Sequence, residues 1–286
     1  MFNISIYLKI SYMKIIEETR QMLSEKFGDI NFVEEGHQYF IDKKEYTPVS
    51  HIIKKYEQPF DEDTKSRAYA EKVGLTQNEV LKNWRLTNRK STISGSRTHE
   101  FGESYTNVMC GHPELICDAN KKQWDDEYKV LLPTYPKEEA IVKFYNEMNF
   151  DPSKRLYVVG AEFKLSTKYM ENVLPICGTA DILFYEEDQI FPEDSGFVIG
   201  DWKTNKELEK DFTVRNDIRM KPPMGDFQDT ALSHYTLQFN LYQKMFESVG
   251  LKIVDRRLIW LKDDGSYEVR YIPKLDDKIM NTILNG

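Results

Sequence analysis

The sequence predicts an α/β protein in which helices flank a β-sheet and a helical insertion precedes the strands. Three short apolar runs, at residues 155–166, 177–187 and 196–204, have the length of strands and are joined by polar connectors that contain proline or glycine. Large apolar side chains occupy both faces of the second run, so the sheet should be covered on both sides. Residues 61–149, in contrast, show helical periodicity and few strand signals.

The composition is that of a folded chain without an overall attraction to nucleic acid. Its 286 residues are 40% hydrophobic and 13% aromatic, which suffices for a core, and no linker-like segment divides them, so we expect one domain over residues 1–286. The formal charge of −8 attracts neither DNA nor an anionic membrane. Cys110, Cys117 and Cys177 form no C-x-x-C pair, which argues against a disulfide framework or zinc ribbon and fits a cytoplasmic compartment.

The apolar N-terminal residues 1–12 are too few to span a bilayer. They also lack the basic region and the cleavage site of a secretory signal. Two interpretations remain open: a first strand, or a tail that results from a start codon upstream of Met13.

Residues 1–60 should form a helix, a hairpin and a short helix. The helix is expected near residues 13–27, and residues 37–50 alternate around a polar turn, as in a β-hairpin. Ser50 is the expected N-cap of the short helix, which Pro59 ends.

Residues 61–150 should form a mostly helical cover, interrupted by turns at 111–113 and 133–136. Residues 80–98 carry five basic side chains and no acidic one: Lys82, Arg85, Arg89, Lys90 and Arg97. By itself such a run is usually a solvated helix face.

The last part, residues 151–286, should contain the three strands as a β-meander, followed by further elements. A polar, basic loop is expected at 205–229 and a helix at 231–250, ended by its glycine. A final hairpin at 256–272 should turn on Gly265 and the aspartate before it.

Three acidic residues should line up across the meander. In an antiparallel hairpin, residues that face each other have numbers whose mean falls in the turn. For Asp181 and Asp201 the mean falls within the connector 188–196, and for Glu162 and Asp181 it falls within 167–175. The three carboxylates should therefore form a row, about 4.8 Å apart per strand step, where like charges repel.

Lys203 lies two residues beyond Asp201 and should point to the same face of the sheet. An ion-pair ladder on a solvent face is one interpretation, although exposed pairs add only about 0–1 kcal/mol of stability. Acids at the ends of core-like strands are costly unless a divalent cation neutralises them, and oxygen ligands favour Mg²⁺ or Mn²⁺ over zinc. Such an ion activates water for phosphodiester hydrolysis, while Lys203 would orient or deprotonate that water or stabilise the transition state.

Two segments around the aspartates resemble a known sequence signature. The segment 178–181, GTAD, followed by 201–204, DWKT, resembles the G-x-x-D … D-x-K-T signature of the PD-(D/E)XK nuclease superfamily, in particular its RecB-like exonuclease branch. The resemblance covers mainly residues 94–109 and 155–248, and the TPVSHIIKKY segment from Thr47 is loosely similar to an opening motif of phage and mitochondrial members. It implies a restriction-endonuclease-like core with a central mixed β-sheet flanked by helices.

The resemblance also implies roles for individual residues. Glu162 would join Asp181, Asp201 and Lys203 as the catalytic set, and His99 would be a metal ligand together with the two aspartates. Taken alone, His99 is more often an ordinary, partly buried histidine. Glu103, one turn after it, could orient the imidazole or form a simple i,i+4 pair.

Gln238 and Tyr242 match the Q-x-x-x-Y helix that follows the D-x-K strand in this branch. The resemblance implies that they position the site or the nucleic acid, whereas the same spacing outside the family is usually a packing stripe.

The basic run before His99, with Arg89, Lys90 and Arg97, becomes a candidate wall of a DNA channel. Trp84 could stack there on a base or belong to the core. Thr204 of the motif is a further candidate for DNA binding or site positioning. A second basic strip follows the motif: Lys206, Lys210, Arg215, Arg219 and Lys221.

The implied activity is that of a Mg²⁺- or Mn²⁺-dependent deoxyribonuclease, as an exonuclease or end-processing enzyme in recombination, repair or phage DNA metabolism. Its setting would be the cytoplasm of a bacterium or of a phage-infected cell. Three cysteines cannot hold the four-cysteine iron–sulfur cluster of some members, and no phosphate loop is present, so a helicase or recombination partner would be a separate protein. A structure- or sequence-selective endonuclease and a non-cleaving DNA-binding module remain alternatives.

Overall fold

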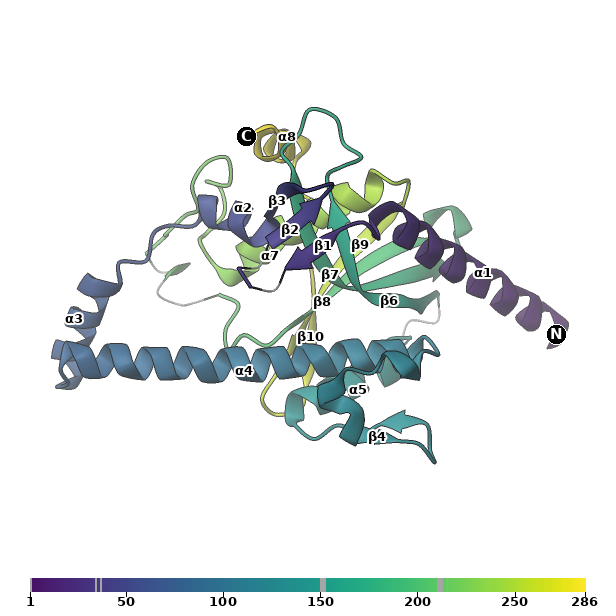
Figure 1. Ribbon diagram of the computed structural model, residues 1–286, viewed down its shortest axis with the longest axis horizontal. Helices are drawn as coiled ribbons and strands as arrows, with labels where there is room; N and C mark the ends of the chain where they lie inside the picture. The colour runs from purple at the N-terminus through teal and green to yellow at the C-terminus, as the bar shows by residue number, and fades with distance from the viewer. Residues whose placement is uncertain (1, 34, 37, 150–152, 210–212, 215) are drawn as a thin grey trace.

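The structure is a computed structural model (Figure 1). It describes the chain except residues 1, 34, 37, 150–152, 210–212 and 215.

Helix α1 (Phe2–Phe27) runs through the whole N-terminal segment. The interpretation of residues 1–12 as a first strand is therefore wrong for the described residues. The helix is continuous because residues 2–27 contain neither proline nor glycine, the two residues that most disfavour a helix interior.

Strands β2 (Gln38–Ile41) and β3 (Lys44–Pro48) form the predicted hairpin, and β1 (Asn31–Val33) pairs with its outer edge. The two turn residues, Asp42 and Lys43, have φ values of 48° and 65°. Positive φ at both central positions gives a two-residue loop the twist that joins antiparallel strands.

The short helix α2 (Val49–Tyr56) begins two residues earlier than expected. Its N-cap is Pro48, which makes no side-chain cap hydrogen bond, so Ser50 as the N-cap is wrong. The fixed φ of the proline, −59°, already leads the chain into the helix, and Ser50 lies within the first turn.

The helical insertion contains three helices: α3 (Glu62–Val73), α4 (Gln77–Met109) and α5 (Pro136–Glu147). Helix α4 begins at a capping box in which Thr76 and Glu79 exchange hydrogen bonds. Two short strands that the sequence did not predict pair beside α5, and two 3₁₀ turns precede them: β4 (Trp124–Asp125), β5 (Val130–Leu131), η1 (Pro113–Leu115) and η2 (Asp118–Gln123).

The central sheet is mixed, with the order β1-β2-β3-β7-β8-β9-β10 and with β6 paired to β7. Pairs β3–β7 and β8–β9 are parallel, and the other pairs are antiparallel, which confirms both the predicted meander and the C-terminal hairpin. The remaining strands are β6 (Lys154–Ser166), β7 (Ile176–Asp188), β8 (Gly196–Lys203), β9 (Ile253–Leu261) and β10 (Tyr267–Tyr271), with a 3₁₀ turn η3 (Pro192–Asp194) before β8.

Helices cover both faces of the sheet, as predicted (Figure 1). Helix α7 (Ala231–Glu247) packs on one face together with α1, α2 and α8 (Asp277–Asn285), whereas α4 and α5 pack on the other. Ile182 and Leu183, neighbours on β7, belong to different hydrophobic clusters, one under each helical layer. Helix α8 was not anticipated.

Among the described residues, no helix combines the length and hydrophobicity required to cross a bilayer.

Two strands share one edge of β7. Strand β3 pairs with its beginning, at Ile176 and Cys177, and β8 pairs with it from Ile182 to Glu186. Within the described ladders, residues 178–181 of β7 have no partner on this edge. The edge therefore opens where β7 changes partner, and Asp181 lies at that opening.

Candidate metal centre

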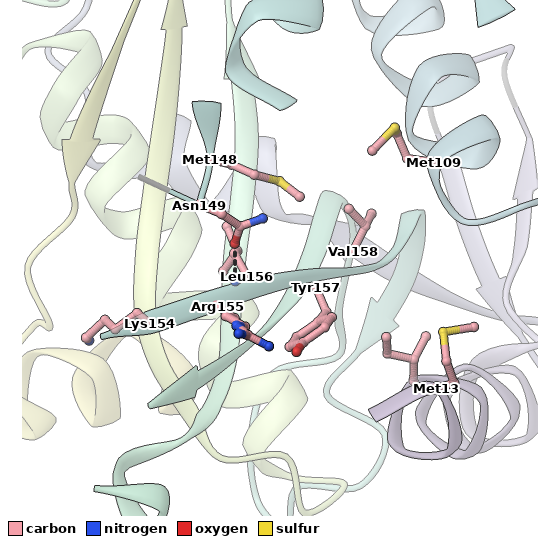
Figure 2. A pocket seen from close by; sticks show the side chains of 10 residues that line it. Met13, Met109, Met148, Asn149, Lys154, Arg155, Leu156, Tyr157 and Val158 are labelled. Atoms are coloured by element: carbon pink, nitrogen blue, oxygen red, sulfur yellow. Dashed lines mark hydrogen bonds between the residues drawn. The ribbon is translucent and has the colours of Figure 1, made fainter. Parts of the chain in front are cut away.

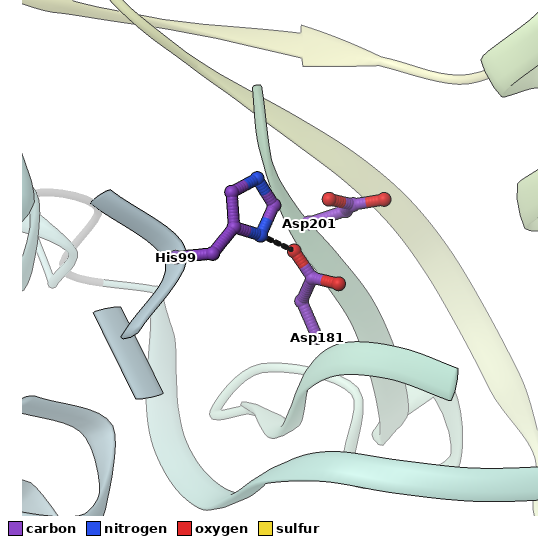
Figure 3. A group of neighbouring side chains, drawn as sticks. All are labelled: His99, Asp181 and Asp201. Atoms are coloured by element: carbon purple, nitrogen blue, oxygen red, sulfur yellow. Dashed lines mark ion pairs between the residues drawn. The ribbon is translucent and has the colours of Figure 1, made fainter. Parts of the chain in front are cut away.

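One histidine and two aspartates meet where β7 and β8 separate (Figure 3). His99, Asp181 and Asp201 each offer one ligand atom, and these atoms lie within 4.8 Å of one another. The Nδ1 atom of His99 is 3.0 Å from Oδ2 of Asp181. The structure therefore brings together the three residues for which the sequence implied metal binding.

The strand register places the two aspartates side by side. Ile182 pairs with Gly200, so the next residues in register, Asp181 and Asp201, face each other as the turn arithmetic predicted. The backbone N–H of Trp202 donates to Oδ2 of Asp181 at 3.2 Å and bridges the two strands. Because the β7–β8 ladder ends here, a side chain from α4 can reach the carboxylates.

Glycine lets α4 approach the end of β8. A Cβ atom on Gly102 would lie 2.6 Å from Nε1 of Trp202, and one on Gly95 would lie 3.3 Å from Oγ1 of Thr204. Real Cβ contacts are not as short as the first distance, so α4 can pack at this depth only with glycine at that position. His99 lies between the two glycines and is thereby held at the opening of the sheet.

Lys203 and Gln238 both contact Asp201. The Nζ atom of Lys203 is 2.7 Å from Oδ2 of Asp201, and Nε2 of Gln238 donates to the same oxygen at 3.4 Å. Gln238 also donates to the Tyr242 hydroxyl at 3.2 Å. Gln238 therefore contacts Asp201 directly, and Tyr242 is linked to the centre through Gln238.

One oxygen of this centre is left open. Oδ1 of Asp201 is buried and accepts no hydrogen bond from the described residues. A buried carboxylate oxygen without a partner destabilises the fold, and a cation bound between His99, Asp181 and Asp201 would satisfy it. The donor set of two carboxylates and one imidazole thus fits a divalent metal ion.

The charges of the centre are strongly coupled. Burial and the negative charge of Asp181 raise the pKa of Asp201 well above its usual value. Burial also acts to raise the pKa of Asp181, but His99, a hydrogen bond with Asp201 and Lys203 outweigh it and hold this pKa well below its usual value. The two carboxyl groups therefore titrate as a coupled pair, in which Asp201 is the group that is harder to ionise.

Lys203 stays charged in this surrounding. Burial acts to lower its pKa, but Asp201 and Asp181 outweigh burial and raise the pKa above its usual value. The ammonium also lies 4.5 Å from the ring centroid of Tyr235, whose hydroxyl donates to Oδ1 of Asn205 at 2.6 Å. The sequence analysis missed Tyr235, although its spacing of three residues from Gln238 would have placed it on the same face of the helix.

Glu162 lies beside the centre rather than in it. Its neighbours Ala161 and Phe163 pair with Ile182 and Ala180, which puts Glu162 level with Asp181 as predicted. However, Glu162 has a φ of 55°, in the left-handed region, and it is not part of the three-residue group. Loss of hydration among the surrounding atoms and the negative charges of Asp181 and Glu103 raise the pKa of the Glu162 carboxyl to about 8.

The candidate DNA-binding residues of α4 lie in different environments. Arg97 is stacked 3.3 Å above the Tyr135 ring centroid, and its Nε is 3.7 Å from the buried Glu138, so its guanidinium contacts the insertion. Arg89 and Lys90 are exposed. Lys90 is nine residues from His99, about two and a half turns, and thus points to the opposite side of the helix, whereas Arg89 lies about a quarter turn from the face of His99.

The second basic strip is only partly described. Lys210 and Arg215 lie outside the described residues, while Lys206 and Lys221 are exposed. The guanidinium of Arg219 forms an ion pair with Asp217 at 2.9 Å. Thr204 directly follows β8, and its hydroxyl faces Gly95 of α4.

Two further sequence candidates have structural contacts of their own. Trp84 packs between Phe60 and Tyr69, with ring centroids 6.1 and 6.0 Å away. Glu103 accepts a hydrogen bond from Sγ of Cys117 at 3.3 Å, whereas the imidazole of His99 pairs with Asp181 instead.

A cavity of about 560 Å³ lies away from this centre, beside α1, the end of α4 and β6 (Figure 2). Met13, Met109 and Met148 contribute to its wall, and none of the predicted site residues does. Its chemistry is therefore separate from that of the histidine–aspartate group.

Comparison of the chain with known proteins adds no relative. The sequence matches no model of a protein family, and a search of curated proteins likewise gives no match.

Proposed function

We propose that the protein is a metal-dependent nuclease that hydrolyses phosphodiester bonds of DNA. The observation that carries the proposal is the convergence of His99, Asp181 and Asp201, with Lys203 2.7 Å from Asp201 and one buried oxygen of Asp201 open. The same residues match the PD-(D/E)XK signature, and the mixed sheet flanked by helices is compatible with the restriction-endonuclease-like core that this signature implies.

His99, Asp181 and Asp201 would hold the ion. Carboxylate oxygens suit Mg²⁺ and Mn²⁺, and Mn²⁺ also accepts an imidazole ligand. Bound there, the ion would activate a water molecule and neutralise charge on the phosphoryl group. Gln238 contributes by fixing the orientation of the Asp201 carboxylate, which it contacts from α7.

Lys203 would act as a charged donor. Because the neighbouring aspartates raise the pKa of Lys203, its ammonium is protonated and cannot serve as the base that deprotonates water. Its position beside Asp201 instead suits a contact with a non-bridging phosphoryl oxygen, whose negative charge grows in the transition state. Of the roles considered for Lys203, electrostatic stabilisation is therefore favoured.

Exonucleolytic or end-processing activity is tested by digesting 5′- and 3′-labelled linear DNA and closed circular DNA with Mg²⁺ or Mn²⁺. We expect linear DNA to be degraded, activity to stop with EDTA, and Asp201→Asn to be inactive while Asp194→Asn, at an exposed position, retains full activity. Degradation of closed single-stranded circles would reassign the enzyme as an endonuclease. Undiminished cleavage by purified Asp201→Asn would refute the proposal.

A further inference from the structure

A second cavity adjoins the candidate metal centre. Its volume of about 390 Å³ falls within the range of roughly 300–1,000 Å³ that is typical of small-ligand sites. Gln238 forms part of its wall and also donates to Asp201, so the cavity and the metal centre share a side chain. Glu162, level with Asp181 in the strand register, lines the cavity as well.

The inner wall of this cavity is aromatic and apolar. The rings of Phe32 and Tyr39 lie with centroids 4.9 Å apart, and Val49 of α2 lines the cavity beside them. Tyr242 closes tightly on Gly178, where a Cβ atom would lie 2.6 Å from the tyrosine ring. Tyr39 and Tyr242 are themselves buried, so Phe32, which is half-buried, is the ring of this wall with a face for stacking on a planar base.

Polar groups surround this apolar wall. Ser50, Glu162 and Lys164 line the cavity and are exposed, and the Thr179 hydroxyl is 3.2 Å from that of Tyr39. An exposed ammonium suits a phosphate, and hydroxyl groups suit a sugar or the edge of a base. The left-handed backbone of Glu162 adds an independent sign, because such strain at non-glycine residues is concentrated at functional sites.

We infer that this cavity binds one nucleoside of the strand that is cut. The base would lie against the half-buried ring of Phe32, which packs on the buried Tyr39, with the phosphate directed toward Lys164 and the metal centre. This inference rests on the proposed nuclease function and extends it by assigning a nucleoside site on the side of the centre where Glu162 and Gln238 lie. The cavity would thereby set the position of the phosphodiester relative to the metal ligands.

Two neighbouring residues of α2 give a matched test. Ser50 lines the cavity, whereas the adjacent His51 does not, and both are exposed, so a tryptophan at either position leaves the core intact. Ser50→Trp should fill the cavity and raise KM for a short single-stranded oligonucleotide by about tenfold or more, the effect of losing one base-stacking contact. His51→Trp should keep the KM of the wild type. Thermal unfolding of both variants checks that the fold is retained.

Binding of thymidine 5′-monophosphate, measured by saturation-transfer NMR, tests the site without cleavage. The wild type and His51→Trp should bind it, and Ser50→Trp should not. Absence of binding to the wild type, or equal binding and equal KM for the two variants, overturns the nucleoside site and leaves the nuclease proposal standing. If the wild type binds the nucleotide, Ser50→Trp does not, and the wild type cleaves no DNA, the nucleoside site is supported and the nuclease proposal is refuted.

Discussion

Replacing Asp201 by asparagine should separate metal binding from folding. Asp201 is 2% exposed, and burial and the charge of Asp181 raise its pKa, so ionisation of this carboxyl group is unfavourable without metal. Asparagine has the same shape, keeps an acceptor oxygen for Lys203 and Gln238, and can donate a hydrogen bond to Asp181. We therefore expect the free energy of unfolding without metal to change by less than about 1 kcal/mol.

The wild type should be more stable than this variant only when metal is added. An ion at a hundred times its dissociation constant stabilises a protein by about 2.7 kcal/mol. The entropy of unfolding, about 2.1 cal/mol/K per residue, amounts to about 0.6 kcal/mol/K for 286 residues, so Tm should rise by about 4–5 °C. With one of three ligands lost, the rise in Asp201→Asn should be below about 1 °C.

Differential scanning calorimetry in EDTA and then in Mn²⁺ or Mg²⁺ measures both quantities, and Asp194→Asn, at an exposed site, serves as the control. An equal metal-dependent rise in the wild type and in Asp201→Asn would show that the aspartate is no ligand. A metal-free variant that melts far below the wild type would show that the Asp201 charge stabilises the fold without metal, and would refute the separation of metal binding from folding.

Three further predictions concern the surroundings of the centre. Lys203→Met should keep the metal-dependent rise in Tm but lower the single-turnover cleavage rate by about 10²-fold or more, because the charged donor is lost; a rate close to that of the wild type would contradict this role. Gly102→Ala places a Cβ 2.6 Å from the Trp202 indole and should reduce stability by about 1–3 kcal/mol in urea unfolding, more than Gly95→Ala, whose nearest atom is 3.3 Å away. For Glu162, the folded-state pKa of about 8 lies above the ordinary 4.5. The contribution of this carboxyl group to the free energy of unfolding is therefore fully present below pH 4.5 and is lost as the pH rises through 8. Metal-free wild type should thus lose stability relative to Glu162→Gln over this range, and urea titrations at about pH 5 and pH 9 that give a constant difference would disprove it.

The sequence predicted the meander and the facing aspartates because both depend on short-range information. Turn lengths fix the register of a hairpin, and the observed pairing of Ile182 with Gly200 confirms the arithmetic for Asp181 and Asp201. Helical periodicity alone also places Lys90 on the side of the helix opposite His99. The prediction that the basic run forms one channel wall leading to His99 did not take this periodicity into account.

Other features depend on long-range contacts that local patterns do not encode. The pairing of β3 with the beginning of β7 joins segments far apart in the chain, and it creates the opening at Asp181. The left-handed φ of Glu162 has no signal in a strand-like run of residues. From the sequence alone, Arg97 is expected to be a free cation. In the fold its guanidinium stacks on Tyr135 and pairs with the buried Glu138.

The centre takes side chains from all three layers of the molecule: His99 from α4, Asp181 and Asp201 from the sheet, and Gln238 from α7. An ion held there would tie the two helical layers to each other through the strands between them. Local opening of α4 or of α7 would then require its release, so that amide hydrogen exchange in both helices would slow together on metal addition. Two layers that pack as separate hydrophobic clusters would thereby become one cooperative unit.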